Sequence, residues 1–352
     1  MRIAVDVSPI SESSSSASAH KVRGVGAYIN MLITNLPKYD KKNEYFFVEN
    51  KIFSSDIDLI HFPYFDPFFI TLPGKLPTKS IVTVHDLMPL VFPEHFPAGI
   101  RGRIKWLIQK SRLKKADLII TDSDCSRRDV VDIVKIPENK ARTVHLAANP
   151  KFVRLKAEDL RDARRKFSLP ESFLLYVGDA TWNKNLPRLI EAVKKTKFKL
   201  VMVGKVWETA EKISSNPWDD DLRKVFKVIE NDSQFIRLGF VSDEGLVALY
   251  NMATAAVMPS IYEGFGLPIL EAMSCGCPVI TTREGSLPEV AGDAVLYVDY
   301  KSEESIKGGI ERVFSETQFR KELLNKGLIQ AKKFSMEKMM KNLVHAYEEI
   351  YR

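Results

Sequence analysis

The sequence predicts an α/β protein made of two Rossmann-like, doubly wound domains. A chain of 352 residues is longer than one hydrophobic core usually covers, which favours two domains. Short β-branched runs alternate with longer helical patterns, and this alternation is found in both halves of the chain. The runs are too short and too apolar for half-exposed strands, so each half is expected to form a parallel sheet covered by helices on both faces.

Twelve short runs are the predicted strands. Those of the first half are Ile3–Val7, Tyr45–Val48, Leu59–Phe62, Ile81–Val84, Leu118–Thr121 and Thr143–Leu146. Those of the second half are Phe173–Val177, Leu200–Val203, Phe235–Leu238, Ala255–Met258, Val279–Thr281 and Val295–Val298. A charged, turn-prone stretch separates the halves, which gives an N-terminal domain over 1–160 and a C-terminal domain over 161–334. Residues 335–352 are expected to form a final helix that packs on the N-terminal domain.

The composition excludes several classes of protein. With 45% hydrophobic and 28% charged residues, the chain resembles an ordinary soluble globular protein. Its N-terminus has the pattern of a strand and not of a secretory signal, and no apolar run approaches the roughly 18 residues of a membrane-spanning helix. Cys125, Cys275 and Cys277 are too few for a disulfide framework, and the last two lack the second ligand pair of a zinc site. We therefore expect a cytoplasmic protein.

Positive charge is concentrated in the first half. Residues 1–150 hold 21 Lys and Arg against 16 Asp and Glu, which is +5 of the net +7. Residues 100–115 contain seven cations and no acid, and apolar residues at helical spacing: Ile104, Leu107, Ile108 and Leu113. Two interpretations remain open, the solvated face of a surface helix or a surface for anionic lipid headgroups or an acidic acceptor at the inner membrane face. Nucleic acid is not an expected partner, because no motif for it accompanies the charge.

The segment Pro259–Pro278 carries the most informative pattern. Pro268 suits the first turn of a short helix, and the flexible Gly264–Gly266 turn before it lets backbone N–H groups approach an anion such as a diphosphate. Glu263 lies in the turn and Glu271 is expected in the first helical turn, where their carboxylates can bind sugar and ribose hydroxyls. Either acid alone would be interpreted as a surface charge. Two acids that flank a Gly-x-Gly turn and a Pro-started helix favour a binding site.

With seven residues between them, Glu263 and Glu271 resemble the paired-glutamate motif of the retaining glycosyltransferases of family 4. The resemblance covers nearly the whole chain and is strongest over residues 237–299. Within the family, the chain is most similar to bacterial and archaeal mannosyltransferases that build surface polysaccharides. The resemblance implies the GT-B fold, in which two domains face a central cleft and the C-terminal helix crosses back to the first domain.

The resemblance also implies substrates and residue roles. The donor would be a nucleotide-diphosphate sugar, GDP-mannose ahead of a UDP-hexose, the acceptor would be a glycan or a lipid-linked saccharide, and no metal or other cofactor would be needed. Glu263 would contact the donor sugar and Glu271 the ribose. The other donor-binding positions of this segment would be Gly264, Phe265, Gly266 and Leu267, and the base would pack near Val241.

A second donor-binding segment follows the predicted strand that ends at Val177. Gly178 comes directly after this strand, and Lys184 lies six residues later, where a cation can neutralise the phosphate of the leaving nucleotide. Relatives usually carry an arginine beside this lysine or just after the glycine, whereas this chain has Asn183 and Asp179. The second phosphate partner is left open among Lys205, Arg23 and Lys21.

The N-terminal half adds a glycine pair and a histidine. Gly24 and Gly26 open the helix expected over 27–36 and match the family's first glycine-rich loop, where the backbone can approach a phosphate or an acceptor. His85 and Asp86 follow a predicted strand. One histidine alone is more often structural, but a His-Asp pair at the carboxyl end of a strand favours function. By resemblance, His85 hydrogen-bonds the donor sugar near the reaction centre, and Asp86 would orient its ring.

Two further segments have a plain interpretation and a functional one. Ser11–His20 is a low-complexity tract, which is typical of a linker but is also placed to close over a substrate. Asp219–Asp221 resembles the acidic metal motif of the other main glycosyltransferase architecture. It lies far along the chain from the paired glutamates, so we expect a solvated loop or a helix start there and predict no metal site.

His85, Lys184 and Glu263 are the predicted catalytic residues. Glu263 and His85 would hold the donor sugar, while Lys184 and the helix N-terminus would stabilise the leaving diphosphate. The acceptor hydroxyl would attack from the same face, and the departing phosphate would take its proton. The alternatives are a GT-B-fold sugar-nucleotide epimerase, which would convert the donor without an acceptor, a non-catalytic nucleotide-sugar-binding protein, and a polymer synthase or phosphorylase.

Overall fold

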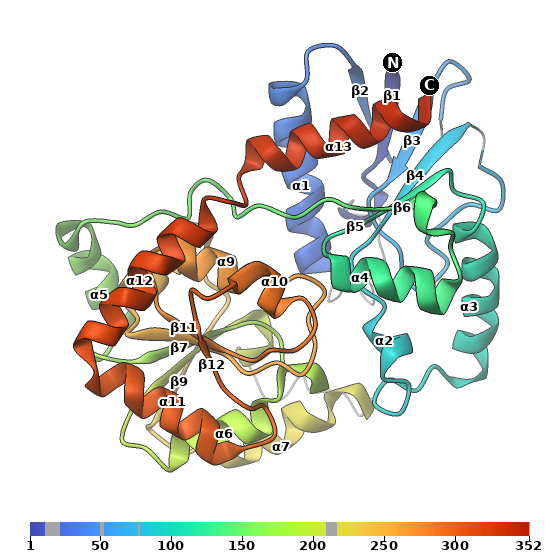
Figure 1. The fold of residues 1–352 in the computed structure, drawn as a ribbon. Coiled ribbons are helices and arrows are strands. Elements are labelled where there is room, and N and C mark those ends of the chain that lie inside the picture. Colours follow the sequence, from blue (N-terminus) through green and yellow to red (C-terminus); the bar gives the residue numbers. More distant parts are fainter. Residues whose placement is uncertain (11–21, 50–52, 77, 209–216, 352) are drawn as a thin grey trace. The chain divides into compact units, whose positions relative to one another are not determined.

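The chain folds into two compact units. The computed structural model describes residues 1–10, 22–49, 53–76, 78–208 and 217–351. Unit 1 comprises Met1–Leu146 and Met336–Arg352, and unit 2 comprises Ala147–Ser335 (Figure 1). The expected linker tract 11–20 and Lys21 lie outside the described residues, as does the side chain of Arg23.

Residues 147–160 pack with unit 2, although the sequence favoured a boundary at residue 160. The ring of Phe152 lies edge-on to that of Tyr250, with centroids 6.0 Å apart. The backbone N–H of Leu155 donates to Asn251 Oδ1 over 2.8 Å. These contacts attach the charged, turn-prone stretch to unit 2 before the first strand of that unit begins.

Unit 1 contains a six-stranded, fully parallel sheet in the order β2-β1-β3-β4-β5-β6. Its strands are β1 (Arg2–Asp6), β2 (Glu44–Val48), β3 (Leu59–Phe62), β4 (Lys79–Val84), β5 (Leu118–Thr121) and β6 (Ala141–Thr143). Its helices are α1 (Val22–Tyr39), α2 (Met88–Val91), α3 (Gly99–Leu113), α4 (Asp124–Asp129) and α13 (Met336–Tyr351). All residues of β3 and β5 are buried, because helices cover both faces of the sheet.

Unit 2 repeats this architecture with the strand order β12-β11-β10-β7-β8-β9. Its strands are β7 (Leu174–Val177), β8 (Leu200–Val203), β9 (Phe235–Gly239), β10 (Ala255–Met258), β11 (Val279–Thr281) and β12 (Leu296–Tyr297). Its helices are α5 (Arg161–Phe167), α6 (Leu186–Lys194), α7 (Asp220–Ile229), α8 (Asp243–Met252), α9 (Leu267–Ser274), α10 (Leu287–Ala291), α11 (Glu303–Ser315) and α12 (Thr317–Ala331). The two parallel sheets with flanking helices confirm the predicted fold class.

Serine caps determine where three of the helices begin. Ser123, Ser242 and Ser302 each accept a hydrogen bond on the side-chain oxygen from the backbone N–H three residues later. Such a cap satisfies one of the N–H groups that the first turn of a helix leaves unpaired. The caps start α4, α8 and α11, which follow β5, β9 and β12, and so they fix the loops at the carboxyl ends of these strands.

The C-terminal helix α13 is part of unit 1, where it packs against α1 and β4 (Figure 1). Its inward side buries Met339, Leu343 and Tyr347. The Tyr347 hydroxyl lies 2.8 Å from Nδ1 of His61, a fully buried residue of β3. The apolar side of this helix is therefore covered by α1 and by the first sheet.

β6 and α1 are among the elements that begin earlier than expected. β6 pairs at Ala141–Thr143 and not at 143–146, because the apolar run continues past the residues that hydrogen-bond to β5. α1 begins at Val22, so Gly24 and Gly26 lie within its first two turns. None of the helices in the described part of the chain combines the length and apolar character that crossing a lipid bilayer requires.

Candidate functional site

In unit 2, the strand order reverses between β7 and β10, which are neighbours in the sheet. β8 and β9 follow β7 on one side, whereas β10, β11 and β12 lie on the other. The loops that leave the carboxyl ends of two such strands diverge to opposite sides, and the crevice between them is where open α/β sheets bind ligands. Gly178 and Lys184 follow β7, and Glu263 follows β10, so the two predicted donor-binding segments meet at this crevice.

An ion pair joins these segments. Nζ of Lys184 lies 2.8 Å from Oε1 and 2.9 Å from Oε2 of Glu263. The Ser260 hydroxyl donates to the same Oε1 over 2.6 Å. Only 8% of Glu263 is exposed, so the pair is largely desolvated and its attraction is stronger than in water. The sequence assigned both residues to the donor but did not predict that they contact each other.

Two asparagines connect the loop after β7, which carries Lys184, to the loop after β10, which carries Glu263. We call these the lysine loop and the glutamate loop. Asn183 donates from its side-chain amide to the carbonyl of Tyr262 over 2.9 Å, and its own carbonyl accepts from the N–H of Ile261 over 2.7 Å. Asn185 donates to the carbonyl of Pro259 over 3.1 Å. Asn183 is buried. At the position where relatives carry an arginine, this chain therefore has a residue that fixes the two loops together.

The backbone of Glu263 is also held from the loop that follows β11. The N–H and the hydroxyl of Ser286 both donate to the Glu263 carbonyl, over 3.2 Å and 2.9 Å. Gly285 has a φ of +59°, and a Cβ at this position would lie 2.8 Å from both N and O of Glu263. Only glycine allows this close approach at this backbone angle. Three loops thus position one carboxylate.

The helix α9 begins directly after the glutamate loop. Gly266 precedes it in a left-handed conformation with a φ of +91°, and Pro268 occupies its first turn, where the missing N–H costs nothing. The positive end of the helix dipole and the backbone of Gly264–Leu267 thus belong to the same loop as the ion pair. This is the environment that a diphosphate prefers.

Glu271 lies in the second turn of α9, and not in the first turn as the sequence suggested, because α9 already begins at Leu267. Its Oε2 accepts a hydrogen bond from the buried Tyr250 hydroxyl over 3.2 Å. Burial raises the pKa of the Glu271 carboxyl to about 8, although the Tyr250 hydrogen bond acts in the opposite direction. The raised pKa shows that the carboxyl group is desolvated within a residue that is partly exposed.

The remaining predicted donor residues of unit 2 lie at the same edge of the sheet. Gly178 follows β7, where its N–H donates to Val203 over 3.0 Å and its carbonyl accepts from the Trp207 indole over 3.2 Å. Val241 follows β9, beside Phe240, whose side chain is exposed. Phe265 is buried, and its ring lies edge-on to that of Phe334, with centroids 5.9 Å apart.

In unit 1, His85 follows β4 and is held on both ring nitrogens. Nδ1 lies 2.7 Å from Oδ2 of Asp122, and Nε2 lies 3.0 Å from the carbonyl oxygen of Pro63. The sequence had suggested Asp86 as the residue that orients the ring. Asp86 instead accepts from the N–H of Met88 at the start of α2. The structure therefore corrects the partner of His85 to Asp122.

The helix α3 of unit 1 leaves most of its apolar side exposed. Ile100, Ile104, Leu107 and Ile108 form what we call the α3 stripe, and the exposed fractions of Ile100 and Leu107 are 80% and 67%. Phe69 in the β3–β4 connection is exposed beside it, and Nζ of Lys105 lies 5.0 Å from the centre of its ring. Of the apolar residues that the sequence placed at helical spacing, Leu113 alone is buried.

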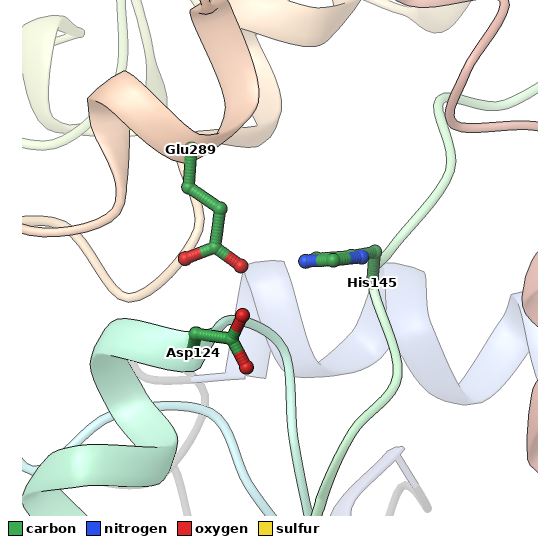
Figure 2. A group of neighbouring side chains, drawn as sticks. All are labelled: Asp124, His145 and Glu289. Carbon is green, nitrogen blue, oxygen red and sulfur yellow. The ribbon is translucent and has the colours of Figure 1, made fainter.

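Asp124 and His145 lie at the carboxyl edge of the unit 1 sheet (Figure 2). The Thr143 hydroxyl donates to Asp124 Oδ1 over 2.6 Å, and this bond, followed by Arg127, lowers the pKa of the Asp124 carboxyl. Figure 2 also draws Glu289, which belongs to α10 of unit 2. We assign no metal to these residues.

The acidic run Asp219–Asp221 forms the start of α7, one of the two structures that the sequence suggested for it. Asp220 and Asp221 pair with cations one turn later in the same helix, Arg223 and Lys224. The run therefore belongs to a helix start, where its acids complement the helix dipole and pair with cations of the next turn. Lys205, one candidate for the second phosphate partner, is exposed in the turn after β8.

Comparisons with known proteins place the chain in a family. Residues 6–152 match the family model described as Glycosyltransferase Family 4, and residues 159–330 match that described as Glycosyl transferases group 1. The O-antigen chain mannosyltransferase B of Escherichia coli is 33% identical over 298 residues, which cover 81% of this chain and 74% of that protein. The serotype-specific mannosyltransferase WbdA of Escherichia coli is 28% identical over 77% of this chain, which spans 33% of that longer protein.

The fold comparison agrees with these sequence matches. The solved structure of sucrose-phosphate synthase from Thermosynechococcus elongatus aligns with 100% of this chain and 99% of its own, with a TM-score of 0.74. The two sequences are 19% identical, so the similarity concerns the fold.

Proposed function

The chain belongs to glycosyltransferase family 4 and is a GT-B-fold glycosyltransferase, and from this premise we propose that it is a retaining mannosyltransferase that uses GDP-mannose. Mannose is supported by the two relatives described above, both of which are named as mannosyltransferases. A UDP-hexose is the second candidate donor. The proposed acceptor is a glycan or a lipid-linked saccharide.

The observation that carries the donor site is the ion pair of Lys184 and Glu263 beside the N-terminus of α9. In the free protein the two charges neutralise each other. A donor diphosphate would draw Lys184 toward its own negative charge, and the carboxylate of Glu263 would then accept hydrogen bonds from sugar hydroxyls. Ser260 keeps its bond to Oε1 and holds the carboxylate in place during this exchange. The exchange replaces one desolvated charge pair by another, which keeps its electrostatic cost low.

The chemistry follows from this arrangement. As the bond from the anomeric carbon to the phosphate oxygen breaks, negative charge grows on the leaving diphosphate, and Lys184 and the N–H groups before α9 stabilise it. The acceptor oxygen forms its bond to the anomeric carbon on the same face, and its proton passes to the departing phosphate. A lysine and a helix N-terminus supply the positive charge, so we propose transfer without a metal ion. The roles of His85 at the donor sugar and of Glu271 at the ribose stay predictions.

We also infer that the α3 stripe contacts an anionic lipid surface on the cytoplasmic side. Four exposed aliphatic side chains share α3 with five of the seven cations of residues 100–115, and the other two, Lys114 and Lys115, follow directly after the helix. Apolar side chains enter the interface between headgroups and acyl chains, while the cations gain about 1 kcal/mol each near anionic lipids. Such a contact would bring the enzyme to a lipid-linked acceptor.

Transfer assays test the proposed function. The purified chain is incubated with GDP-mannose, UDP-glucose or UDP-galactose, with and without a lipid-linked saccharide acceptor, and the products are analysed by mass spectrometry and NMR. We expect mannose to be transferred only when an acceptor is present, with the α configuration of the donor retained. A β-linked product would contradict the retaining mechanism. Transfer from a UDP-sugar but not from GDP-mannose would contradict the proposed donor. Conversion of the donor without an acceptor would support the epimerase alternative.

A further inference from the structure

His85 has a hydrogen-bond acceptor on each side of its ring. The carbonyl oxygen of Pro63 can only accept, so Nε2, which lies 3.0 Å away, must carry a proton. Oδ2 of Asp122 lies 2.7 Å from Nδ1, and an ionised carboxylate also only accepts. The geometry is therefore satisfied when both nitrogens are protonated and the ring carries a positive charge. A neutral ring would need the proton to reside on the carboxyl group of Asp122 instead.

Asp122 depends on His85 in turn. Its side chain is 5% exposed, and its second oxygen, Oδ1, has no hydrogen-bond partner among the described residues. A buried carboxylate with one empty oxygen is costly unless a cation lies next to it. His85 is the cation that the structure supplies, at a distance typical of a charge-assisted hydrogen bond.

We propose that Asp122 is a positioning residue that keeps His85 as a fixed imidazolium ion, so that His85 acts as a positive charge and not as a proton acceptor. Both ring nitrogens are engaged in the structure, so the predicted bond from His85 to a donor sugar hydroxyl would have to replace the bond to Pro63 or to Asp122. The charge of His85 offsets that of Asp122, and loss of the ring proton would leave a net negative charge that disfavours an anionic donor. The part of this inference that concerns the donor rests on the proposed function, whereas the charge state of His85 does not.

The titratable groups that face the ring from the described residues are consistent with this charge state. Burial alone would lower the pKa of His85, but the charge and hydrogen bond of Asp122 outweigh it and raise the pKa, with smaller contributions from Pro63 and Asp86. Tyr28 of α1 lies edge-on, with ring centroids 4.9 Å apart, and burial raises its pKa, so it stays neutral. His61 of β3 is fully buried with a pKa lowered to about 3, and it too is neutral.

The proximity of His85 and Asp122 arises from the register of the sheet. Val84 of β4 pairs with Thr121 of β5, and each of these residues ends its strand. The next residues along the two chains are His85 and Asp122, so parallel pairing delivers them to the same edge side by side. Ser126 fixes the arrangement further, because its hydroxyl donates to the backbone carbonyl of His85 over 2.9 Å.

NMR on the full-length protein tests the charge state directly. Histidine is labelled with ¹⁵N and ¹³C, and the His85 signals are assigned by their loss in His85→Gln. We expect both ring nitrogens of His85 to have imidazolium shifts at pH 7.5, where an unperturbed histidine of pKa about 6.5 is mostly neutral. In Asp122→Asn the midpoint of the His85 titration should fall by at least about one pH unit, a tenfold change in proton affinity. Asp86→Asn, a neighbouring carboxylate that caps α2, should shift it less.

Kinetics tests the consequence for the donor. In the wild type, the KM for the donor should rise with pH only above the raised pKa of His85, and in Asp122→Asn this rise should begin about one pH unit lower, with kcat changed less than KM. A neutral His85 in the wild type at pH 7.5, or an unchanged midpoint in Asp122→Asn, would overturn the inference. If Asp122→Asn does not fold, the wild-type ring-nitrogen shifts still decide the charge state. If no sugar is transferred but the shifts are those of an imidazolium, the proposed function fails and the assignment of Asp122 stands.

Discussion

Lys184 and Glu263 are 79 residues apart in the chain, yet the lysine ammonium lies within 2.9 Å of both carboxylate oxygens of the glutamate. Each is the natural partner of a different part of a nucleotide sugar, the phosphate for the cation and the sugar for the acid. In the free protein they satisfy each other, which keeps two desolvated charges stable until a donor arrives. The following predictions start from this pair and extend to the rest of the chain.

Replacement of Lys184 by methionine should lower kcat by about 10²–10³, because the leaving diphosphate loses its cation. The variant should also be less stable, since Glu263 then keeps a buried charge without a partner. Lys184→Met and Lys332→Met, an exposed lysine of the same unit, are compared in transfer assays and thermal unfolding. Wild-type turnover in Lys184→Met would remove this lysine from the mechanism.

Introduction of the arginine that relatives carry, as Asn183→Arg, should destabilise the protein and not improve donor binding. Asn183 is buried and makes hydrogen bonds to the glutamate loop, and an arginine cannot replace these bonds in the same space. We expect a lower melting temperature and a higher KM for the donor. A lower KM with unchanged stability would show that the position still serves the phosphate.

Glu271→Gln should change how stability depends on pH. The pKa of Glu271 is raised to about 8 in the folded protein from 4.5, so its contribution to stability is fully present below pH 4.5 and is lost as pH rises toward 8. In the Glu271→Gln variant this loss of stability does not occur, because glutamine does not titrate. Its melting temperature should therefore fall less between pH 5 and pH 8.5 than that of the wild type, in calorimetry without ligand. Parallel curves for the two proteins would contradict the assignment.

Polar substitution of the α3 stripe should weaken membrane binding without affecting the fold. In a variant with Ile104 and Leu107 changed to serine, sedimentation with vesicles of 30% phosphatidylglycerol should decrease at least about tenfold, while thermal stability stays the same, because both side chains are exposed. Ile329→Ser, at an equally exposed isoleucine of α12, is the matched control. Equal vesicle binding by the stripe variant and the control would contradict the proposal that the α3 stripe contacts the membrane.

Tyr347→Phe should lower the free energy of unfolding by about 0.5–1.5 kcal/mol, the usual net value of one hydrogen bond. The hydroxyl is removed from a fully buried contact with His61. The pKa of His61 is lowered to about 3 in the folded protein, so wild-type stability should fall as pH decreases from about 6.5 toward 3. Urea titrations at pH 5 and pH 8 measure both effects. A variant as stable as the wild type would show that the hydroxyl does not help to hold α13.

Most of the fold could be predicted because buried parallel strands are nearly continuous apolar runs. The limits of β3, β5, β8, β10 and β11 agree with the sequence prediction. β6 was placed too late because apolar residues continue beyond its last paired residue, and an apolar run does not show where pairing stops.

The site was less predictable, because it depends on which strands are neighbours. The residues of the Lys184–Glu263 pair were both identified, but only the adjacency of β7 and β10 brings them together. Asp122 was missed. It comes directly after a predicted strand, as His85 does, and that shared position was the available signal. To use this signal, one would have to know that β4 and β5 are paired with their ends in register.

Finally, the return of α13 to unit 1 affects the order in which the protein can fold during synthesis. Unit 1 needs two separate stretches of the chain, whereas Ala147–Ser335 is continuous. A ribosome releases the first sheet early, and this sheet has to wait, with His61 and the surface beneath α13 uncovered, until residues 336–351 have been synthesised. Unit 2 is thus the part able to mature first. A nonsense mutation just before Met336 would therefore harm the domain that was translated first.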